Sequence, residues 1–309
     1  MAATREFTFD SSTGKNKIYA CEWAPETAPR AVLQISHGVL EHIGRYDALA
    51  RFFTAHGFLV VGNDHLGHGR SAASPEELGF FAEKDGWEHL VRDMRALTEM
   101  TQRNCGALPY FLFGHSMGSL LVHTYLIRYQ TGLTGAILSA MGRQSAMRIL
   151  TGRAAVQGEI KKHGTHFRSE TLNKICFSPY SKAFRPARTP SDWISSDEAV
   201  VDAYIADPFT RFVPTAGLFS DMAQGAAYVQ KKSNLRRMNK KTPVLFYAGA
   251  KDPVSGAGKG VTAAYESFRA AGMEDVTLKL YENGRHEMHN EVCRETVLGD
   301  VLSWMESKM

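Results

Sequence analysis

The stretch YFLFGHSMGS (Tyr110–Ser119) joins a strand pattern to a helical one through a serine with flanking glycines. Its first four residues are apolar and mostly aromatic, which favours a buried strand, and the apolar spacing over 117–129 is typical of a helix. Gly114 and Gly118 stand where side chains would clash in a sharp strand-to-helix turn. Such a turn would expose the Ser116 hydroxyl at a helix N-terminus, as a nucleophile requires. A serine that only caps the helix is the alternative.

Strand and helix patterns alternate on both sides of this stretch, which predicts an α/β protein with a mostly parallel central sheet flanked by helices. Continuous apolar runs suited to strands buried on both faces are 31–36, 58–63, 134–140, 243–249 and 276–281. Helical spacing covers 46–56, 86–105, 261–271 and 291–308. The segments 6–10 and 17–23 flank the turn-rich SSTGKN and predict an antiparallel hairpin at the sheet edge.

Between about residues 142 and 240, roughly a hundred residues separate two predicted strands that a simple crossover would join with far fewer. Helical spacing over 146–162, 196–205 and 215–231 indicates a structured insertion, whereas the proline-containing 178–193 is interpreted as a connection. We expect 1–142 and 241–309 to form the core. We expect 143–240 to form a helical cap over the carboxyl edge of the sheet, where α/β sheets bind ligands.

A serine hydroxyl needs a base and an orienting carboxylate before it attacks a carbonyl. Asp252 follows the predicted strand 243–249 in the turn AKDPV, and His286 follows 276–281 in the loop ENGRHEMH. Both stand just past carboxyl ends of strands, on the same edge as Ser116, and in the expected chain order. We therefore predict that Ser116, Asp252 and His286 form a catalytic triad. The alternatives are an Asp252 that only forms a turn and an ordinary histidine.

The negative charge that develops on the attacked carbonyl oxygen needs fixed N–H donors. The amide of Met117, immediately after the serine, is one candidate. The other is expected in the loop HGVLEH (37–42), where Gly38 permits an unusual turn and Val39 can present its N–H. The predicted reaction is cleavage of a carboxylic ester through an acyl-enzyme, in which neither a metal nor an organic cofactor takes part.

Histidine-rich motifs elsewhere do not fit a metal site. HEMH is one residue short of the zinc-binding H-E-x-x-H, and the four cysteines form no C-x-x-C pair. In NDHLGHGRS (63–71) we expect a turn tightened by two glycines, with Asp64 and His68 bonded to backbone. No metal is expected.

The net charge of +4 and pI near 8.8 are too weakly basic to indicate a nucleic-acid partner. The N-terminus has no apolar core of a signal peptide, and the chain has no run of about 18 apolar residues, so a cytoplasmic, soluble protein is expected. The basic run KKSNLRRMNKK (231–241) has two interpretations. One is a solvated helix end, and the other is transient contact with a membrane surface.

Five segments together resemble the monoacylglycerol lipase and lysophospholipase family of the α/β-hydrolase superfamily: HGVLEHIGRY (37–46), NDHLGHGRS, GHSMGS, AKDPV and RHEMHNE. The resemblance covers most of the chain outside the middle of the cap, and H-G-x-x-E-H-x-x-R-Y is its most specific part. It implies an α/β-hydrolase fold and a serine hydrolase that acts on single-chain lipid esters. It also implies that Glu41, Arg45 and His289 bind the glycerol or head group; a Glu41–Arg45 pair that only braces its loop is the alternative.

Other functions stay open at this point. The middle of the cap, 161–188, is basic and aromatic, which favours a carboxylesterase for short-chain or aromatic esters. An aminopeptidase-type hydrolase would use the same triad. A ligand-binding protein without catalysis is a further alternative, because a fold does not fix a function, although such proteins usually lack a triad member.

Overall fold

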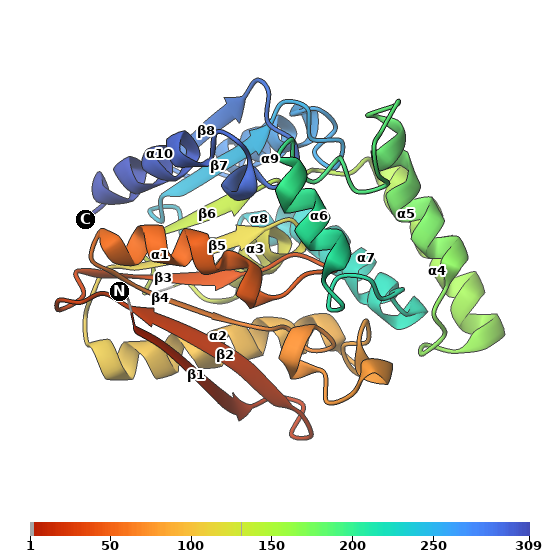
Figure 1. Cartoon of the computed structure of the whole chain (residues 1–309), viewed down its shortest axis with the longest axis horizontal. Helices are drawn as coiled ribbons and strands as arrows, with labels where there is room; N and C mark the ends of the chain where they lie inside the picture. Colours follow the sequence, from red (N-terminus) through yellow and green to blue (C-terminus); the bar gives the residue numbers. More distant parts are fainter. Residues whose placement is uncertain (1–2, 131) are drawn as a thin grey trace.

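The computed structural model describes residues 3–130 and 132–309, which fold around one eight-stranded sheet (Figure 1). Its strands are β1 (Ala3–Asp10), β2 (Lys17–Ala24), β3 (Ala31–Ser36), β4 (Phe58–Asn63), β5 (Tyr110–His115), β6 (Gly135–Ser139), β7 (Val244–Gly249) and β8 (Val276–Tyr281). Their spatial order is β1-β2-β4-β3-β5-β6-β7-β8. The pairs β1–β2 and β2–β4 are antiparallel, and every other neighbouring pair is parallel. The predicted α/β class and the edge hairpin are confirmed.

Burial follows the position of each strand in the sheet. Every residue of β3, β4, β5, β6 and β7 is buried, as expected for strands covered on both faces. The expectation of two-sided burial was wrong for β8, in which Lys279 and Leu280 are exposed. The reason is that β8 pairs only with β7 and forms the sheet edge.

Helices cover both faces of the sheet. On one face, α1 (Asp47–Ala55) and α10 (Arg294–Glu306) pack into one apolar cluster with β3, β5 and β7. On the other face, α2 (Gly86–Cys105), α3 (Met117–Arg128) and α9 (Lys259–Ala270) pack into a second cluster. Short 3-10 helices interrupt the loops: η1 (Ile43–Tyr46), η2 (Gly69–Ser71), η3 (Pro75–Glu77) and η4 (Met288–Asn290).

Five helices lie between β6 and β7: α4 (Ala146–His163), α5 (Glu170–Lys182), α6 (Glu198–Ala206), α7 (Ala216–Gln230) and α8 (Lys232–Leu235). Figure 1 shows α4 to α7 on the side of the sheet to which the arrow of β3 points. The first four helices begin after a side chain that accepts a hydrogen bond from the first turn: Ser145, Ser169, Asp197 and Thr215. We interpret the residues 143–240 that contain these helices as a cap.

Helix α5 is a correction to the sequence analysis, because residues 178–182 are helical and not part of a connection. Pro179 lies in the last turn of α5, where the loss of one backbone hydrogen bond does not break the helix.

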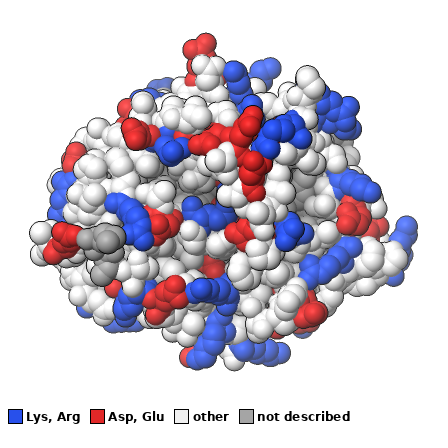
Figure 2. All heavy atoms as spheres, in the orientation of Figure 1, with Lys and Arg blue, Asp and Glu red and all other residues white. Residues whose placement is uncertain are grey.

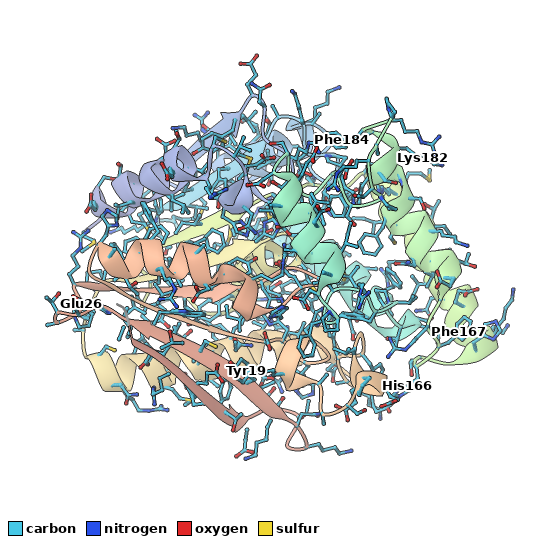
Figure 3. The ribbon with its side chains drawn as sticks, in the orientation of Figure 1. Tyr19, Glu26, His166, Phe167, Lys182 and Phe184 are labelled. Atoms are coloured by element: carbon cyan, nitrogen blue, oxygen red, sulfur yellow. The ribbon has the colours of Figure 1, made fainter. Side chains whose placement is uncertain are left out.

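The pair α4 and α5 is attached to the rest of the chain at opposite ends (Figure 3). At one end the His166 ring stacks on Phe80 at 3.9 Å between ring centres, and at the other the guanidinium of Arg285 lies 4.5 Å from the centre of the Phe184 ring.

Acidic and basic side chains are intermingled on the face shown in Figure 2. The basic run 231–241 contains α8 and turns Leu235 and Met238 inward, while most of its lysines and arginines are exposed. None of the helices within the described residues is both long enough and apolar enough to cross a membrane.

Candidate active site

Ser116 lies in the tight turn between β5 and α3, with a backbone φ of 52° and ψ of −117°. A non-glycine residue rarely adopts positive φ, so the surroundings must hold this conformation. The Ser116 N–H donates to the Ser139 carbonyl at 3.0 Å. A β-carbon on Gly114 would lie 2.4 Å from the Gly118 oxygen, and one on Gly118 would lie 2.0 Å from the Ser36 oxygen. The turn therefore requires both glycines.

Asp252 and His286 form a buried pair. The His286 Nδ1 lies 3.0 Å from Asp252 Oδ1, and the two residues are 4 % and 0 % exposed. The carboxylate also accepts the N–H groups of Val254 at 2.9 Å and Ser255 at 3.3 Å. Burial by itself lowers the pKa of His286, but the Asp252 carboxylate, together with those of Glu287 and Glu41, outweighs burial and raises that pKa above its ordinary value. Asp252 is thus placed to orient the His286 imidazole and to favour its protonated form.

The loop of His286 is held by the inserted segment. The N–H of His286 donates to the Trp193 carbonyl at 3.3 Å, and the N–H of Glu287 donates to the Ile194 carbonyl at 2.8 Å. The Trp193 ring also lies 5.1 Å from the His286 ring, centre to centre. The sequence analysis did not identify this support for the histidine.

The serine and the pair meet at one edge of the sheet. The His286 ring lies 4.7 Å from the ring of His115, the residue before Ser116. Val254, two residues after Asp252, lines the same cavity as Ser116. Within the described residues the Ser116 hydroxyl does not donate a hydrogen bond to His286; such bonds are often long without substrate and tighten when it binds.

The loop that carries Val39 packs against the serine. A β-carbon on Gly38 would lie 3.2 Å from the Ser116 Cβ. The His37 Nε2 accepts the N–H of His65 at 3.0 Å, so Nδ1 carries the proton and donates to the Gly38 carbonyl at 2.7 Å. Because the peptide unit is planar and trans, fixing that carbonyl also fixes the Val39 N–H, which points the opposite way.

The N–H groups of Val39 and Met117 donate to no other group in the part of the chain that the structure describes. The Met117 amide is at the first position of α3, where a helix leaves its N–H groups without an internal acceptor. Both predicted donors are therefore available to an oxygen on the substrate.

Glu41 and Arg45 belong to a buried network that includes Glu287. Arg45 donates to Glu41 at 3.0 Å and to both carboxylate oxygens of Glu287 at 2.7 and 2.8 Å. Glu41 also accepts the N–H of Gly38 and, at 2.9 Å, the hydroxyl of Tyr46. Arg45 holds the pKa of Glu287 at about 2, whereas burial raises the pKa of Glu41 to about 7. The network braces the loop that carries Val39.

His289 packs beside this network. Its ring stacks on Tyr46 with 4.8 Å between centres and is 1 % exposed. Glu41, Arg45 and His289 are not among the residues that line the large cavity at Ser116. Their expected contact with a head group stays a prediction. Glu287 accepts two hydrogen bonds from Arg45 and is its main partner.

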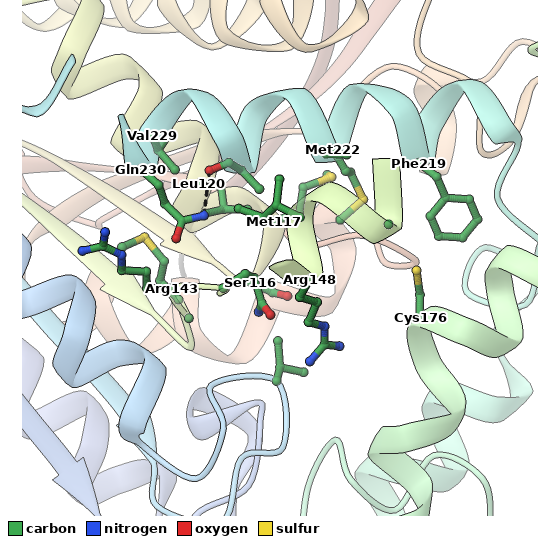
Figure 4. A pocket seen from close by; sticks show the side chains of 18 of the residues that line it. Ser116, Met117, Leu120, Arg143, Arg148, Cys176, Phe219, Met222, Val229 and Gln230 are labelled. Atoms are coloured by element: carbon green, nitrogen blue, oxygen red, sulfur yellow. Dashed lines mark hydrogen bonds between the residues drawn. The ribbon is translucent and has the colours of Figure 1, made fainter. Parts of the chain in front are cut away.

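A cavity of about 520 Å³ begins at Ser116 and extends between α3, α4, α5, α7 and α9 (Figure 4). Its size is within the usual range of small-molecule sites. The segment 161–188 is basic and aromatic in composition. The residues of this segment that line the cavity are Leu172, Ile175, Cys176, Phe177 and Tyr180. The basic side chains of that segment do not line the cavity, whereas Arg143 and Arg148, from the beginning of the cap, do.

The turn at 63–71 has the predicted contacts with the backbone. Asp64 accepts the N–H groups of Ile43 and Arg70, both at 2.7 Å, and the His68 ring bonds to the Leu66 carbonyl at 3.1 Å. These side chains fix the loop geometry.

The chain is similar to known proteins in sequence and in fold. Residues 27–292 match the family described as serine aminopeptidase, S33. The chain is 31 % identical to a monoacylglycerol lipase from Mycolicibacterium smegmatis over the whole of both chains, and 28 % identical to the human monoglyceride lipase over 94 % of this chain and 87 % of that protein. Its fold is similar to a carboxyl esterase from Bacillus coagulans in complex with glycerol, with a TM-score of 0.91, 29 % identity and 99 % of each chain covered.

Proposed function

Because the chain belongs to the monoacylglycerol lipase family of the α/β-hydrolase superfamily and is an ester hydrolase, we propose that it cleaves monoacylglycerols at Ser116. The observation that carries the proposal is the cavity of about 520 Å³ that begins at Ser116 and has a mainly apolar wall. A single acyl chain gains free energy when it leaves water for such a wall, at about 0.8 kcal/mol per buried CH₂ group.

In the proposed reaction, His286 takes the proton of Ser116 as the serine oxygen attacks the ester carbonyl. The Asp252 carboxylate holds the imidazole in the required tautomer and stabilises its positive charge. The N–H groups of Val39 and Met117 stabilise the oxyanion. When the tetrahedral intermediate collapses, His286 gives its proton to the leaving glycerol, and water then cleaves the acyl-enzyme by the same route.

A carboxylesterase for shorter or aromatic esters is the second candidate, favoured by the similarity to the Bacillus coagulans esterase. Both activities use the same triad, so the residues at Ser116 do not separate them. A lysophospholipase differs in the head group, for which the cavity wall gives no assignment.

The test is labelling by a fluorophosphonate probe, followed by kcat/KM for monoacylglycerols of graded chain length. Ser116→Ala should lose labelling and turnover, while Ser303→Ala, which changes an outward-facing serine on α10, should keep both. A rise of kcat/KM with chain length supports the lipase, and a maximum at short chains moves the assignment to the carboxylesterase. Labelling that survives in Ser116→Ala contradicts the proposed nucleophile.

A further inference from the structure

The wall of the cavity at Ser116 carries positive charge. Arg143 lies between β6 and α4, Arg148 lies in the first turn of α4, and both line the cavity. Among the described residues of the wall there is neither an aspartate nor a glutamate. The carboxylate of Asp252 is buried and paired with His286, and it does not line the cavity. The charge of the wall therefore comes from the two arginines.

Neither arginine has an acidic partner. In the part of the chain that the structure describes, neither Arg143 nor Arg148 forms an ion pair with a carboxylate, whereas Arg188 of the cap pairs with Asp202 at 2.7 Å. Both arginines are exposed, so a molecule that enters the cavity can reach their guanidinium groups. A guanidinium has five N–H donors in a planar fork that fits the oxygens of a carboxylate or a phosphate. These donors are available to an anionic ligand.

Arg148 lies near the catalytic histidine. Burial raises the pKa of Tyr180, and the positive charge and hydrogen bond of Arg148 oppose this increase, so the guanidinium lies close to the Tyr180 hydroxyl. The Tyr180 ring lies 5.1 Å from the Trp193 ring, which lies the same distance from the His286 ring. The His286 ring is therefore at most twice that distance from Tyr180. A charge at Arg148 is close enough to contact a substrate whose ester is bound at Ser116.

Figure 4 shows the two arginines on either side of Ser116. Arg148 lies on the side toward Cys176 of α5, and Arg143 lies on the opposite side. Gln144, which also lines the cavity, adds an amide beside Arg143. We call the part of the wall formed by Arg143, Gln144 and Arg148 the arginine wall. A substrate bound at Ser116 thus has a positive charge on each side of its ester.

We propose that the arginine wall binds an anionic group, a carboxylate or a phosphate, that the substrate carries close to its ester, an inference that rests on the proposed function. The substrate class is an anionic monoester, with the charge on the acyl chain or on the alcohol. The same triad cleaves a neutral monoacylglycerol, but that substrate gains nothing from the charge. The preference comes from contact and not from the net charge of the protein, because salt at about 0.1 M screens exposed charges beyond about 10 Å.

The test compares kcat/KM for pairs of esters that differ only in charge. On the acyl side, the glycerol monoesters of succinic, adipic and suberic acid are each paired with the corresponding ω-amide, which keeps the size of the group. On the alcohol side, the octanoate ester of 6-hydroxyhexanoate is paired with that of 6-hydroxyhexanamide. The wild-type protein should prefer the carboxylate in at least one pair by about three- to tenfold, the range of one or two exposed ion pairs. The preference should fall toward one at about 1 M salt, and the pair that shows it identifies which part of the substrate meets the arginine wall.

The double variant Arg143→Gln/Arg148→Gln should bring that preference to about one, and the single variants assign it to one side of Ser116. Arg153→Gln is the matched control and should keep the preference, because Arg153 is an exposed arginine of α4 that does not line the cavity. The ratio within each variant does not depend on how much protein is folded.

A wild-type ratio of one or less in every pair, with turnover of monoacylglycerols intact, overturns the inference and leaves the proposed function standing. A preference that survives the double variant, or that Arg153→Gln removes to the same extent, also overturns it. Absence of turnover for every ester contradicts the proposed function itself, and the inference falls with it.

Discussion

Removal of Arg45 tests whether the network around the Val39 loop stabilises the fold. Arg45 is the one cation between Glu41 and Glu287 in the network that the structure describes, and the three side chains are 10 %, 3 % and 4 % exposed. Arg45→Met keeps much of the aliphatic volume but leaves the carboxylates without their positive partner. The variant should be destabilised, because a buried charge that loses its partner retains the cost of its desolvation.

The magnitude can be worked from the burial of this network. Breaking a buried ion pair by removing one partner costs about 3–5 kcal/mol. An unfolding entropy of about 2.1 cal/mol/K per residue gives roughly 0.65 kcal/mol/K for a chain of 309 residues. Arg45→Met should therefore lower the Tm by about 5–8 °C. Arg51→Met on α1 is the matched control, because its ion pair with Asp47 is exposed and such pairs contribute about 0–1 kcal/mol.

Calorimetric melting at pH 7 and pH 4 is the assay. In the wild type the pKa of Glu287 is about 2, below its ordinary value near 4.5, so its contribution to stability is present above pH 4.5 and is lost as the pH falls toward 2. Without Arg45 that pKa rises, and protonation at pH 4 relieves the buried charge. The difference in Tm should thus be larger at pH 7 than at pH 4. A Tm within 2 °C of the wild type at pH 7 would refute the reasoning.

The remaining predictions concern the reaction and the turn. Asp252→Asn should lower kcat by about 10⁴, measured with the preferred monoacylglycerol, because the imidazole loses the carboxylate that sets its tautomer; a loss of less than tenfold would contradict the role of Asp252. In the wild type, kcat/KM should fall with decreasing pH as His286 is protonated, with a midpoint above 6.5 because the pKa of His286 is raised; a midpoint below 6.5 would contradict this. Gly118→Ala should give little folded protein by circular dichroism, because its β-carbon would meet the Ser36 oxygen at 2.0 Å, whereas Gly158→Ala in the open face of α4 should stabilise the fold by about 0.5–1 kcal/mol.

The elements that the sequence predicted most closely are those with a local signal. The strands β3, β4 and β8 and the helix α2 have the predicted bounds, since an apolar run or a helical spacing ends at a turn-forming residue in each case. The helical end of α5 was missed because Pro179 usually stops a helix, and its position in the last turn depends on where the helix begins. The exposure of β8 depends on which strands pair, and the residues of a strand do not show which strands will lie beside it in the sheet.

The same distinction applies to the site. Ser116, Asp252 and His286 could be predicted because each follows a strand, and the carboxyl ends of parallel strands meet at one edge. Glu287 could not be assigned to Arg45, because 242 residues separate them and only the packed fold brings the carboxylate and guanidinium together. His123 of α3 carries no local signal in the sequence, and its burial against Phe268 of α9 depends on how the helices pack. Candidate catalytic residues at strand ends can thus be predicted from the sequence. Substrate selectivity depends on how the helices pack around the cavity, so it has to be tested by substitutions in the folded protein.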